Sequence, residues 1–231
     1  MENSKPLPKV LFTTDLSAGQ QEVLKSTDYS FESLPFITFE YVASEEWKPK
    51  MKVNPDTWVF TSKRAVKAIK AVIDSLEKPE FIFAVGDKTA RKLEKLSLSP
   101  IIPAEFNLES LAERMNNFKL KNVIHFCGNL KSGNLSELLK DKSIDVTSIE
   151  VYRTNLNPQK VEESKYDSFV FMSPSAVESF SQKNTLHENS TVFCIGPSTA
   201  KALEKAGLTT FITAEESTVD SLAASIQKFY S

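Results

Sequence analysis

Short apolar runs alternate along this chain with segments whose apolar residues recur every three or four positions. In Lys88–Leu96, for example, Ala90, Leu93 and Leu96 share one helical face. Continuous apolar strands alternating with amphipathic helices are typical of parallel sheets covered on both faces. The pattern therefore predicts an α/β fold with doubly wound parallel sheets. The apolar runs expected to form strands are KVLFTT, WVFTS, FIFAVG, VIHFCG, FVFMS and VFCIG.

The chain also repeats itself. Thr57–Leu98 and Ser168–Leu208 both contain VF-x-S-x-x-AV, followed at nearly the same distance by F-x-x-G-x-x-TA-x-x-LEK-x-x-L. The match continues beyond these ranges, where AEFNLESLA (Ala104–Ala112) in the first copy corresponds to AEESTVDSLA (Ala214–Ala223) in the second. A repeat of this length indicates that the chain contains two similar domains.

A weaker repeat pairs Lys9–Tyr41 with Asn122–Thr154, so the chain has the order A–B–A′–B′. A tandem arrangement would join A with B. A nested arrangement would join A with B′ and carry the chain between domains twice, near Phe36–Ser44 and Ser148–Asn155. Both segments are rich in β-branched and aromatic residues, which favours bridging strands over flexible linkers. The periodicity alone leaves the two arrangements open.

Composition and charge narrow the function classes. The 231 residues include 28 Lys and Arg against 30 Asp and Glu, so we expect no nucleic-acid partner, which normally requires a basic excess. No apolar run is long enough for a bilayer or a signal peptide, which predicts a cytoplasmic protein without a membrane partner. Cys127 and Cys194 are expected to be reduced core thiols. Neither the cysteines nor the two histidines have the spacing of a metal site.

Three of the six glycines stand where predicted strands end. Ligands of open parallel sheets bind beyond the carboxyl ends of the strands, and free N–H groups at a helix start attract carboxylate or phosphate. Two homologous copies therefore favour a matching anion-binding edge in each repeat. The candidate ligand-binding residues are Thr61, Ser62, Arg64, Gly86, Lys88, Thr89, Gly128, Ser173, Ser175, Gly196, Ser198 and Thr199.

The same positions have a purely structural interpretation, because every α/β protein needs turns and caps there. Ser62 and Ser173 can act as N-caps of the helices that follow them. After the glycines at 86 and 196, Asp87 or Ser198, or the threonine that follows each, can cap the next helix. A capping role and a ligand-binding role are compatible.

Five segments together resemble the uroporphyrinogen-III synthase family. The resemblance covers essentially the whole chain in the right order. It implies the nested arrangement of two flavodoxin-like domains, one from residues 1–37 and 155–231 and the other from 42–150, with a two-stranded bridge and an active cleft between the domains. The segments are FTSKRAV (Phe60–Val66), FAVGDKTARKL (Phe83–Leu93), VYRT (Val151–Thr154), FMSPSAVESF (Phe171–Phe180) and CIGPSTAKALEKAGL (Cys194–Leu208).

The resemblance also implies a reaction. Hydroxymethylbilane, a linear tetrapyrrole with eight carboxylates, loses its hydroxyl group and closes to uroporphyrinogen III with inversion of the last ring. No cofactor is implied, and we expect a monomer. The family places Tyr152 at the cleft, where its phenol would assist departure of the hydroxide; the competing interpretation is an aromatic residue that only packs. Lys63 stands where many members of the family have a proline, whereas the second copy of the repeat has that proline, Pro174.

Two other function classes fit parts of the pattern. A two-domain binding protein that closes on an anionic ligand suits the duplicated lobes equally well, and an assay with hydroxymethylbilane would distinguish it from an enzyme. A receiver-like signalling module would use Asp15 after the first strand, but its further acidic residues and lysine are not apparent. The phosphate-loop, dinucleotide-binding and nucleophile-elbow motifs are absent from the sequence.

Overall fold

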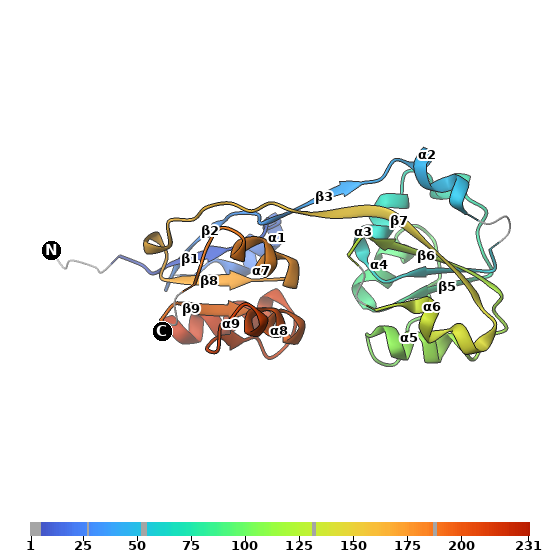
Figure 1. Ribbon diagram of the computed structural model, residues 1–231. Coiled ribbons are helices and arrows are strands. Elements are labelled where there is room, and N and C mark those ends of the chain that lie inside the picture. Colours follow the sequence, from blue (N-terminus) through green and yellow to red (C-terminus); the bar gives the residue numbers. More distant parts are fainter. Residues whose placement is uncertain (1–5, 27, 52–54, 131–132, 187–188) are drawn as a thin grey trace. The chain divides into compact units, whose positions relative to one another are not determined.

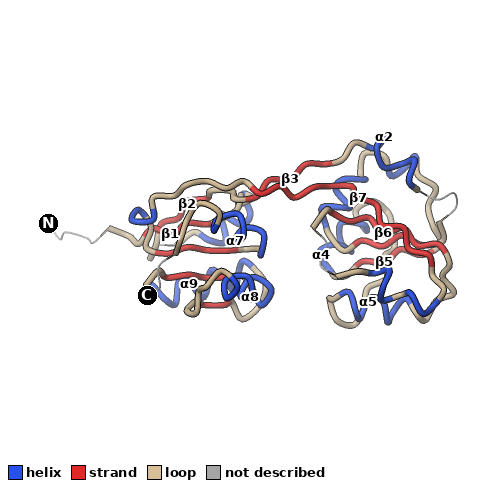
Figure 2. Tube along the Cα trace, in the orientation of Figure 1, coloured by secondary structure: helices blue, strands red, loops and turns tan. Residues whose placement is uncertain are grey.

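The computed structural model describes residues 6–26, 28–51, 55–130, 133–186 and 189–231. The chain divides into two compact units, unit 1 with residues Met1–Thr38 and Asn155–Ser231, and unit 2 with Phe39–Thr154. Each unit contains one five-stranded sheet (Figures 1 and 2). Within the described ranges, no helix combines the length and apolar character of a membrane span.

In unit 1 the strands follow the order β10-β9-β8-β1-β2, and all four neighbouring pairs are parallel. The strands are β1 (Lys9–Phe12), β2 (Ser30–Ser33), β8 (Ser168–Phe171), β9 (Thr191–Cys194) and β10 (Ile212–Thr213). The helices are α1 (Ala18–Leu24), α7 (Pro174–Ser181), α8 (Pro197–Lys205) and α9 (Val219–Tyr230), and a 3-10 turn covers Glu163–Lys165.

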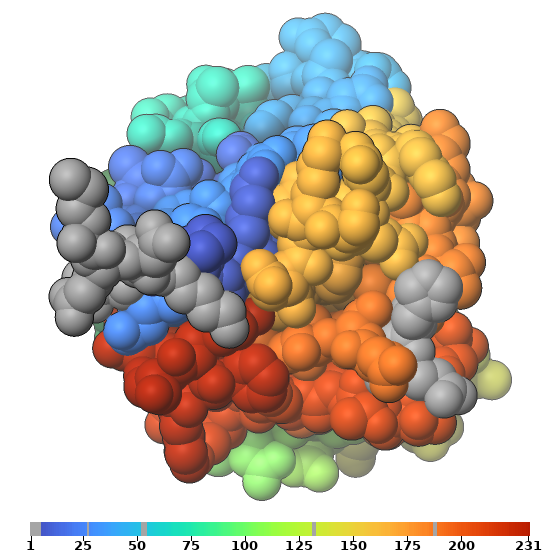
Figure 3. All heavy atoms as spheres, turned by 90° about the vertical axis from the view of Figure 1, so that its left-hand side faces the viewer, coloured from blue at the N-terminus to red at the C-terminus, as the bar shows by residue number. Residues whose placement is uncertain are grey.

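Two apolar layers cover the two faces of this sheet. On one face, Phe171 packs with Phe180 of α7 and Leu203 of α8. On the other, side chains of α1 and α9 pack against β1, β8 and β9. The helices α1 and α9, from opposite ends of the chain, lie side by side, and Gln227 Nε2 donates to Asp28 Oδ2 at 3.3 Å. Figure 3 shows the blue and red segments on one surface of this unit.

In unit 2 the order is β3-β7-β6-β4-β5, and the pairs β7–β6, β6–β4 and β4–β5 are parallel. The strands are β3 (Ile37–Tyr41), β4 (Thr57–Phe60), β5 (Phe81–Ala84), β6 (Asn122–Gly128) and β7 (Asp145–Leu156). The helices are α2 (Ser44–Trp47), α3 (Lys63–Ile69), α4 (Asp87–Glu94), α5 (Leu108–Met115) and α6 (Leu135–Leu138). Short 3-10 turns cover Lys48–Lys50, Ile73–Ser75 and Lys140–Lys142.

The core of unit 2 also has two layers. Phe60 and Phe126 stack at 5.1 Å between ring centroids, and Trp58 meets Phe126 edge to face at 5.6 Å. The helices α3 and α4 cover this layer, whereas α5 covers the opposite face, where Met115 packs with Val59. Burying such aromatic and aliphatic side chains contributes about 1.5–3 kcal/mol each, so these layers dominate the stability of the unit.

The α/β fold with parallel sheets, expected from the apolar runs, is confirmed. The strongly repeated segments form equivalent strand pairs in different units: Phe60 aligns with Ala84 in β4–β5, and Phe171 with Cys194 in β8–β9. β1 pairs with β8, and β6 with β4. The chain passes between the units within β3 and within β7, which are neighbouring strands. The carboxyl ends of parallel strands lie at the same end of a sheet. In each unit, this end of the sheet, with the loops and helix starts that follow the parallel strands, is called the rim of unit 1 or the rim of unit 2.

Candidate active site

The rim of unit 2 is built from the ends of β4, β5 and β6. The Ser62 hydroxyl caps α3 by accepting from the Arg64 backbone N–H at 3.1 Å. The Thr61 hydroxyl lies 3.0 Å from Nε2 of the buried His125 on β6. Gly86 is the N-cap of α4 and, without a side chain, offers no capping oxygen. Two of the predicted hydroxyl groups, both on half-buried residues, therefore already have protein partners.

The rim of unit 1 repeats this construction. Ser173 caps α7 by accepting from the Ala176 N–H at 3.2 Å, and its Oγ lies 3.3 Å from Oγ of Ser175. Gly196 is the N-cap of α8, and Pro197 is the first helical residue. The predicted caps at Asp87 and Ser198 are wrong, because the preceding glycines occupy the N-cap positions and no side chain caps either helix.

The remaining rim residues differ in how far they reach solvent. Thr89 and Thr199 are buried in the first turns of α4 and α8, and the backbone N–H of each donates to the carbonyl of the preceding glycine cap. Lys88 and Ser198 are exposed at the equivalent positions just before them. The first turns of the two helices therefore present the same arrangement, with a lysine in unit 2 where unit 1 has a serine.

Tyr152 lies on β7 and is nearly buried, with 9% of its surface exposed. It pairs with Gly128, the last residue of β6, beyond a register shift after Cys127. Among the described residues, none is hydrogen-bonded to its hydroxyl. The phenol is thus placed in the apolar layer of unit 2 with its polar group still available.

Arg64 lies close to this tyrosine. Its guanidinium sits 3.6 Å above the ring centre of Phe39 on β3. Burial lowers the pKa of Arg64, while Tyr152 and Tyr41 act in the opposite direction. An arginine remains charged under such a shift, so a partly desolvated cation stands beside the Tyr152 phenol.

Further cations gather around the starts of α3 and α4. Burial lowers the pKa of Lys63, and repulsion from Arg64, Lys88 and Lys92 lowers it further. The residue that replaces the expected proline therefore adds an ammonium group to a cluster of like charges. Such a cluster is destabilising by itself and attracts anions.

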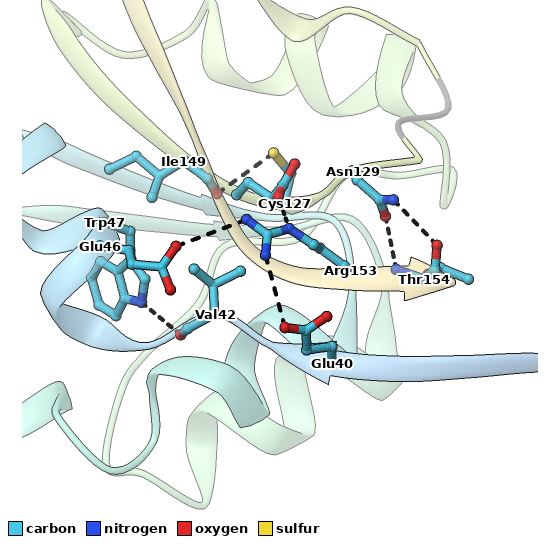
Figure 4. A network of polar contacts seen from close by, with 10 residues as sticks. Glu40, Val42, Glu46, Trp47, Cys127, Asn129, Ile149, Arg153 and Thr154 are labelled. Atoms are coloured by element: carbon cyan, nitrogen blue, oxygen red, sulfur yellow. Dashed lines mark hydrogen bonds and ion pairs between the residues drawn. The ribbon is translucent and has the colours of Figure 1, made fainter. Parts of the chain in front are cut away.

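Arg153, next to Tyr152 in the chain, is engaged within the protein (Figure 4). Its Nε donates to Glu150 at 2.8 Å, and its other nitrogens lie 3.8 Å from Glu40 and 3.9 Å from Glu46. These contacts tie β7 to β3 and α2. Nearby, Asn129 exchanges hydrogen bonds of 3.2 and 2.8 Å with the Thr154 backbone. These contacts hold the part of the VYRT segment that directly follows Tyr152.

Two rim residues were missed in the sequence. Phe106 lies over Gly86, such that a Cβ on that glycine would stand 3.1 Å from the phenyl Cγ. In unit 1, a Cβ on Gly196 would clash with Oγ of Ser217. Both residues fall within the repeated AEFNLESLA and AEESTVDSLA segments. The repeat aligns these two segments with each other, at nearly the same distance after Gly86 and Gly196, and this correspondence could have identified the two residues.

A cavity of about 130 Å³ in unit 1 lies elsewhere, between α7 and α8. Its lining includes Asn184 and Leu208, which follow the carboxyl ends of these helices, and none of the predicted site residues. In the part of the chain that the structure describes, no three His, Cys, Asp or Glu side chains form a group that could hold a metal ion. Each rim thus remains a candidate ligand-binding site of its own unit, with hydroxyl groups and a helix start in both and cations in unit 2.

Comparison with known proteins points to one family. A family model described as uroporphyrinogen-III synthase HemD matches residues 21–224. A mutant uroporphyrinogen III synthase from the extremely thermophilic bacterium Thermus thermophilus superposes with a TM-score of 0.70 at 17% identity, covering 96% of this chain and 98% of that one. The uroporphyrinogen-III synthetase of Helicobacter pylori gives a TM-score of 0.67 at 16% identity, covering 96% and 100%. At these identities the structural likeness shows the fold, whereas the family match extends over most of the sequence.

Proposed function

Since the chain belongs to the uroporphyrinogen-III synthase family, we propose that it converts hydroxymethylbilane to uroporphyrinogen III, a lyase reaction of tetrapyrrole biosynthesis. The match of the family model over residues 21–224 carries this proposal. The chemistry of the rims supports it, because a substrate with eight carboxylates requires many hydrogen-bond donors and cations.

The reaction needs an acid at one point. Departure of the substrate's hydroxyl group takes up a proton and leaves the electrophilic azafulvene in its protonated, cationic form, with water as the second product. The substituted carbon of the last ring attacks the freed methylene carbon, and the resulting spiro intermediate breaks and closes again with that ring inverted. A proton is then lost, so the net change is the loss of one water. The pyrrole nitrogens supply the electron pairs for these steps.

Tyr152 is the residue that we propose for the acid step. A phenol can donate a proton or a hydrogen bond to a leaving hydroxide. The nearby guanidinium of Arg64 would stabilise the negative charge that develops on the phenol oxygen as the proton moves. The small exposed fraction of Tyr152 suits a group that contacts the substrate but is largely shielded from solvent.

The rims would bind the carboxylates and fold the chain of pyrroles. In unit 2, Lys63, Arg64 and Lys88 supply positive charge. In unit 1, Ser175, Ser198 and the backbone N–H groups at the start of α8 supply hydrogen-bond donors. Holding the last ring near the methylene carbon lowers the barrier by proximity, which can contribute several kcal/mol.

Several finer features belong to the same proposal. The two units would be flavodoxin-like domains, with limits at 1–37, 42–150 and 155–231, connected by the paired strands β3 and β7. The enzyme would act as a cytoplasmic monomer without a cofactor or a nucleic-acid partner. Gly86, Gly128 and Gly196 would contribute to the site indirectly, because the absence of a Cβ leaves room for the side chains of Phe106, Tyr152 and Ser217.

The test is an isomer analysis of the product. Freshly made hydroxymethylbilane is incubated with the purified protein, without added metal or nucleotide, and the oxidised products are separated by chromatography. We expect the type III isomer to exceed type I, whereas heat-inactivated protein yields type I by spontaneous closure. Type I alone, formed at the spontaneous rate, would identify the chain as a binding protein without this activity.

A further inference from the structure

Phe106 has an unusual environment for an apolar side chain. It lies in the loop between α4 and α5, and its ring rests on Gly86, with Cγ, Cβ and Cδ1 at 3.1, 3.2 and 3.4 Å from the position of a Cβ on that glycine. Nevertheless 60% of Phe106 is exposed, more than any other large apolar residue among those the structure describes. One side of the ring is therefore supported by backbone, and the remainder faces solvent.

The loop holds this ring in a defined place. The neighbouring Asn107 caps α5 by accepting from the Ser110 N–H at 2.7 Å, and its amide donates to Glu105 at 3.0 Å. The Glu105 N–H in turn donates to Oγ of Ser110 at 3.3 Å. These hydrogen bonds hold the loop backbone on both sides of Phe106 at the start of α5.

Unit 1 contains the same loop with a different residue at this point. Thr218 caps α9 through the Ser221 N–H at 3.2 Å, and the Glu216 N–H donates to Oγ of Ser221 at 3.1 Å. Ser217 then occupies the place of Phe106, with its hydroxyl over Gly196. The backbone thus accepts a small polar residue here, and an exposed phenyl ring is not required by the fold.

We propose that Phe106 is a specificity residue that packs against a pyrrole ring of the substrate at the rim of unit 2. This inference rests on the proposed function. Hydroxymethylbilane combines flat apolar rings with carboxylate side chains, and aromatic rings prefer to pack against one another. Lys88, in the first turn of the helix that Gly86 caps, and the nearby Lys63 provide cations for the carboxylates next to such a ring.

The test compares the KM for hydroxymethylbilane among variants of the full chain. We expect Phe106→Ala to raise KM about tenfold, the factor that corresponds to losing one aromatic contact. Phe106→Trp keeps a ring and should retain a KM at or below that of the wild type. Phe106→Leu keeps apolar contact with Gly86 but lacks the ring, so it gives a second measurement if the alanine variant does not fold. Phe229→Ala, which removes a phenyl group that is 50% exposed on α9, is the matched control and should leave KM unchanged.

The outcomes separate this inference from the proposed function. If the wild type forms the type III isomer and the alanine and leucine variants retain its KM, the contact with a pyrrole ring is refuted while the function stands. A raised KM in the tryptophan variant as well would indicate a distorted rim and would also overturn the inference. If the wild type forms no type III isomer, the proposed function fails, and the role of Phe106 fails with it.

Discussion

Gly128 lies directly against the phenol ring of Tyr152: a methyl group at Gly128 would stand 2.5 Å from Cζ and 2.9 Å from Oη of the tyrosine. The two residues face each other across β6 and β7, beyond the register shift that follows Cys127. Real side-chain contacts are not this short, so the ring could not keep its place if residue 128 had a Cβ. The position of the proposed acid therefore depends on a glycine in the neighbouring strand.

We expect Gly128→Ala to lower kcat/KM by about tenfold to a hundredfold, because a displacement of about 1 Å in a reacting group can have effects of this size. Crowding in a packed layer should also lower the free energy of unfolding by about 1–3 kcal/mol. Steady-state kinetics and urea denaturation measure the two effects. Gly19→Ala is the matched control, since a Cβ there meets nothing within 4 Å and alanine favours the helix α1.

A double-variant cycle separates the position of the ring from its chemistry. Tyr152→Phe removes only the hydroxyl group and should itself lower kcat/KM by at least about tenfold. Adding Gly128→Ala to the phenylalanine variant should then cost much less activity than it does in the wild type. Full additivity of the two losses, or wild-type kinetics in Tyr152→Phe, would show that the phenol does not act as the acid.

The sequence made some of these features predictable. Strands such as β4 and β8 appear as continuous apolar runs because both of their faces are buried, and Ser62 and Ser173 act as the expected caps because a hydroxyl group before a helix satisfies a free N–H. The contact between Gly128 and Tyr152 was not predictable. It depends on a register shift between β6 and β7, and a shift of one residue turns every following side chain to the other face.

The orientation of loop side chains was equally hidden. Phe106 follows an irregular segment, and sequence periodicity does not reveal that its ring would lie on Gly86 rather than in the core. Arg153 belongs to the VYRT segment, and the sequence did not reveal that the carboxylates of Glu40, Glu46 and Glu150 surround it. Such relationships depend on tertiary packing, which local patterns do not encode.

The variant Lys63→Pro tests whether the cluster of positive charges at the starts of α3 and α4 contributes to substrate binding. Lys63 is the first residue of α3, and Ser62 before it is extended (φ −147°, ψ 136°), so proline fits without strain. We expect a gain of about 0.4–1 kcal/mol in the free energy of unfolding. We also expect KM for hydroxymethylbilane to rise about twofold to fivefold, the equivalent of one screened ion pair. Thermal unfolding and steady-state kinetics measure the two changes.

Two comparisons make the Lys63 result interpretable. Lys63→Met removes the same charge without fixing the backbone, so it should raise KM to a similar extent. Lys70→Ala removes a lysine at the opposite end of α3 and should leave KM unchanged. An unaltered KM in both Lys63 variants would mean that the ammonium group does not bind the substrate.

Glu32 provides a prediction about pH that is independent of activity. Its carboxylate accepts from Lys9 Nζ at 2.7 Å, and hydrogen bonds from Lys9 and then Tyr166 lower the pKa of Glu32. Burial and the contact with Glu32 raise the pKa of Tyr166 to about 12. A carboxyl group whose pKa is lower in the folded than in the unfolded state stabilises the protein above the unfolded value of about 4.3, and this stabilisation is lost as the pH falls through the folded value.

We therefore expect Glu32→Gln to lower the free energy of unfolding at pH 7 by about 0.2–1 kcal/mol, the range for exposed ion pairs. Below about pH 4 the difference in the free energy of unfolding between wild type and variant should shrink towards zero. The wild-type carboxyl group is then protonated and, like the glutamine, carries no charge. Urea denaturation at pH 3, 5 and 7 measures it, with Glu204→Gln on the exposed face of α8 as the control. A difference that stays constant across this range would show that the charge of Glu32 does not contribute to stability, and that its effect comes from packing alone.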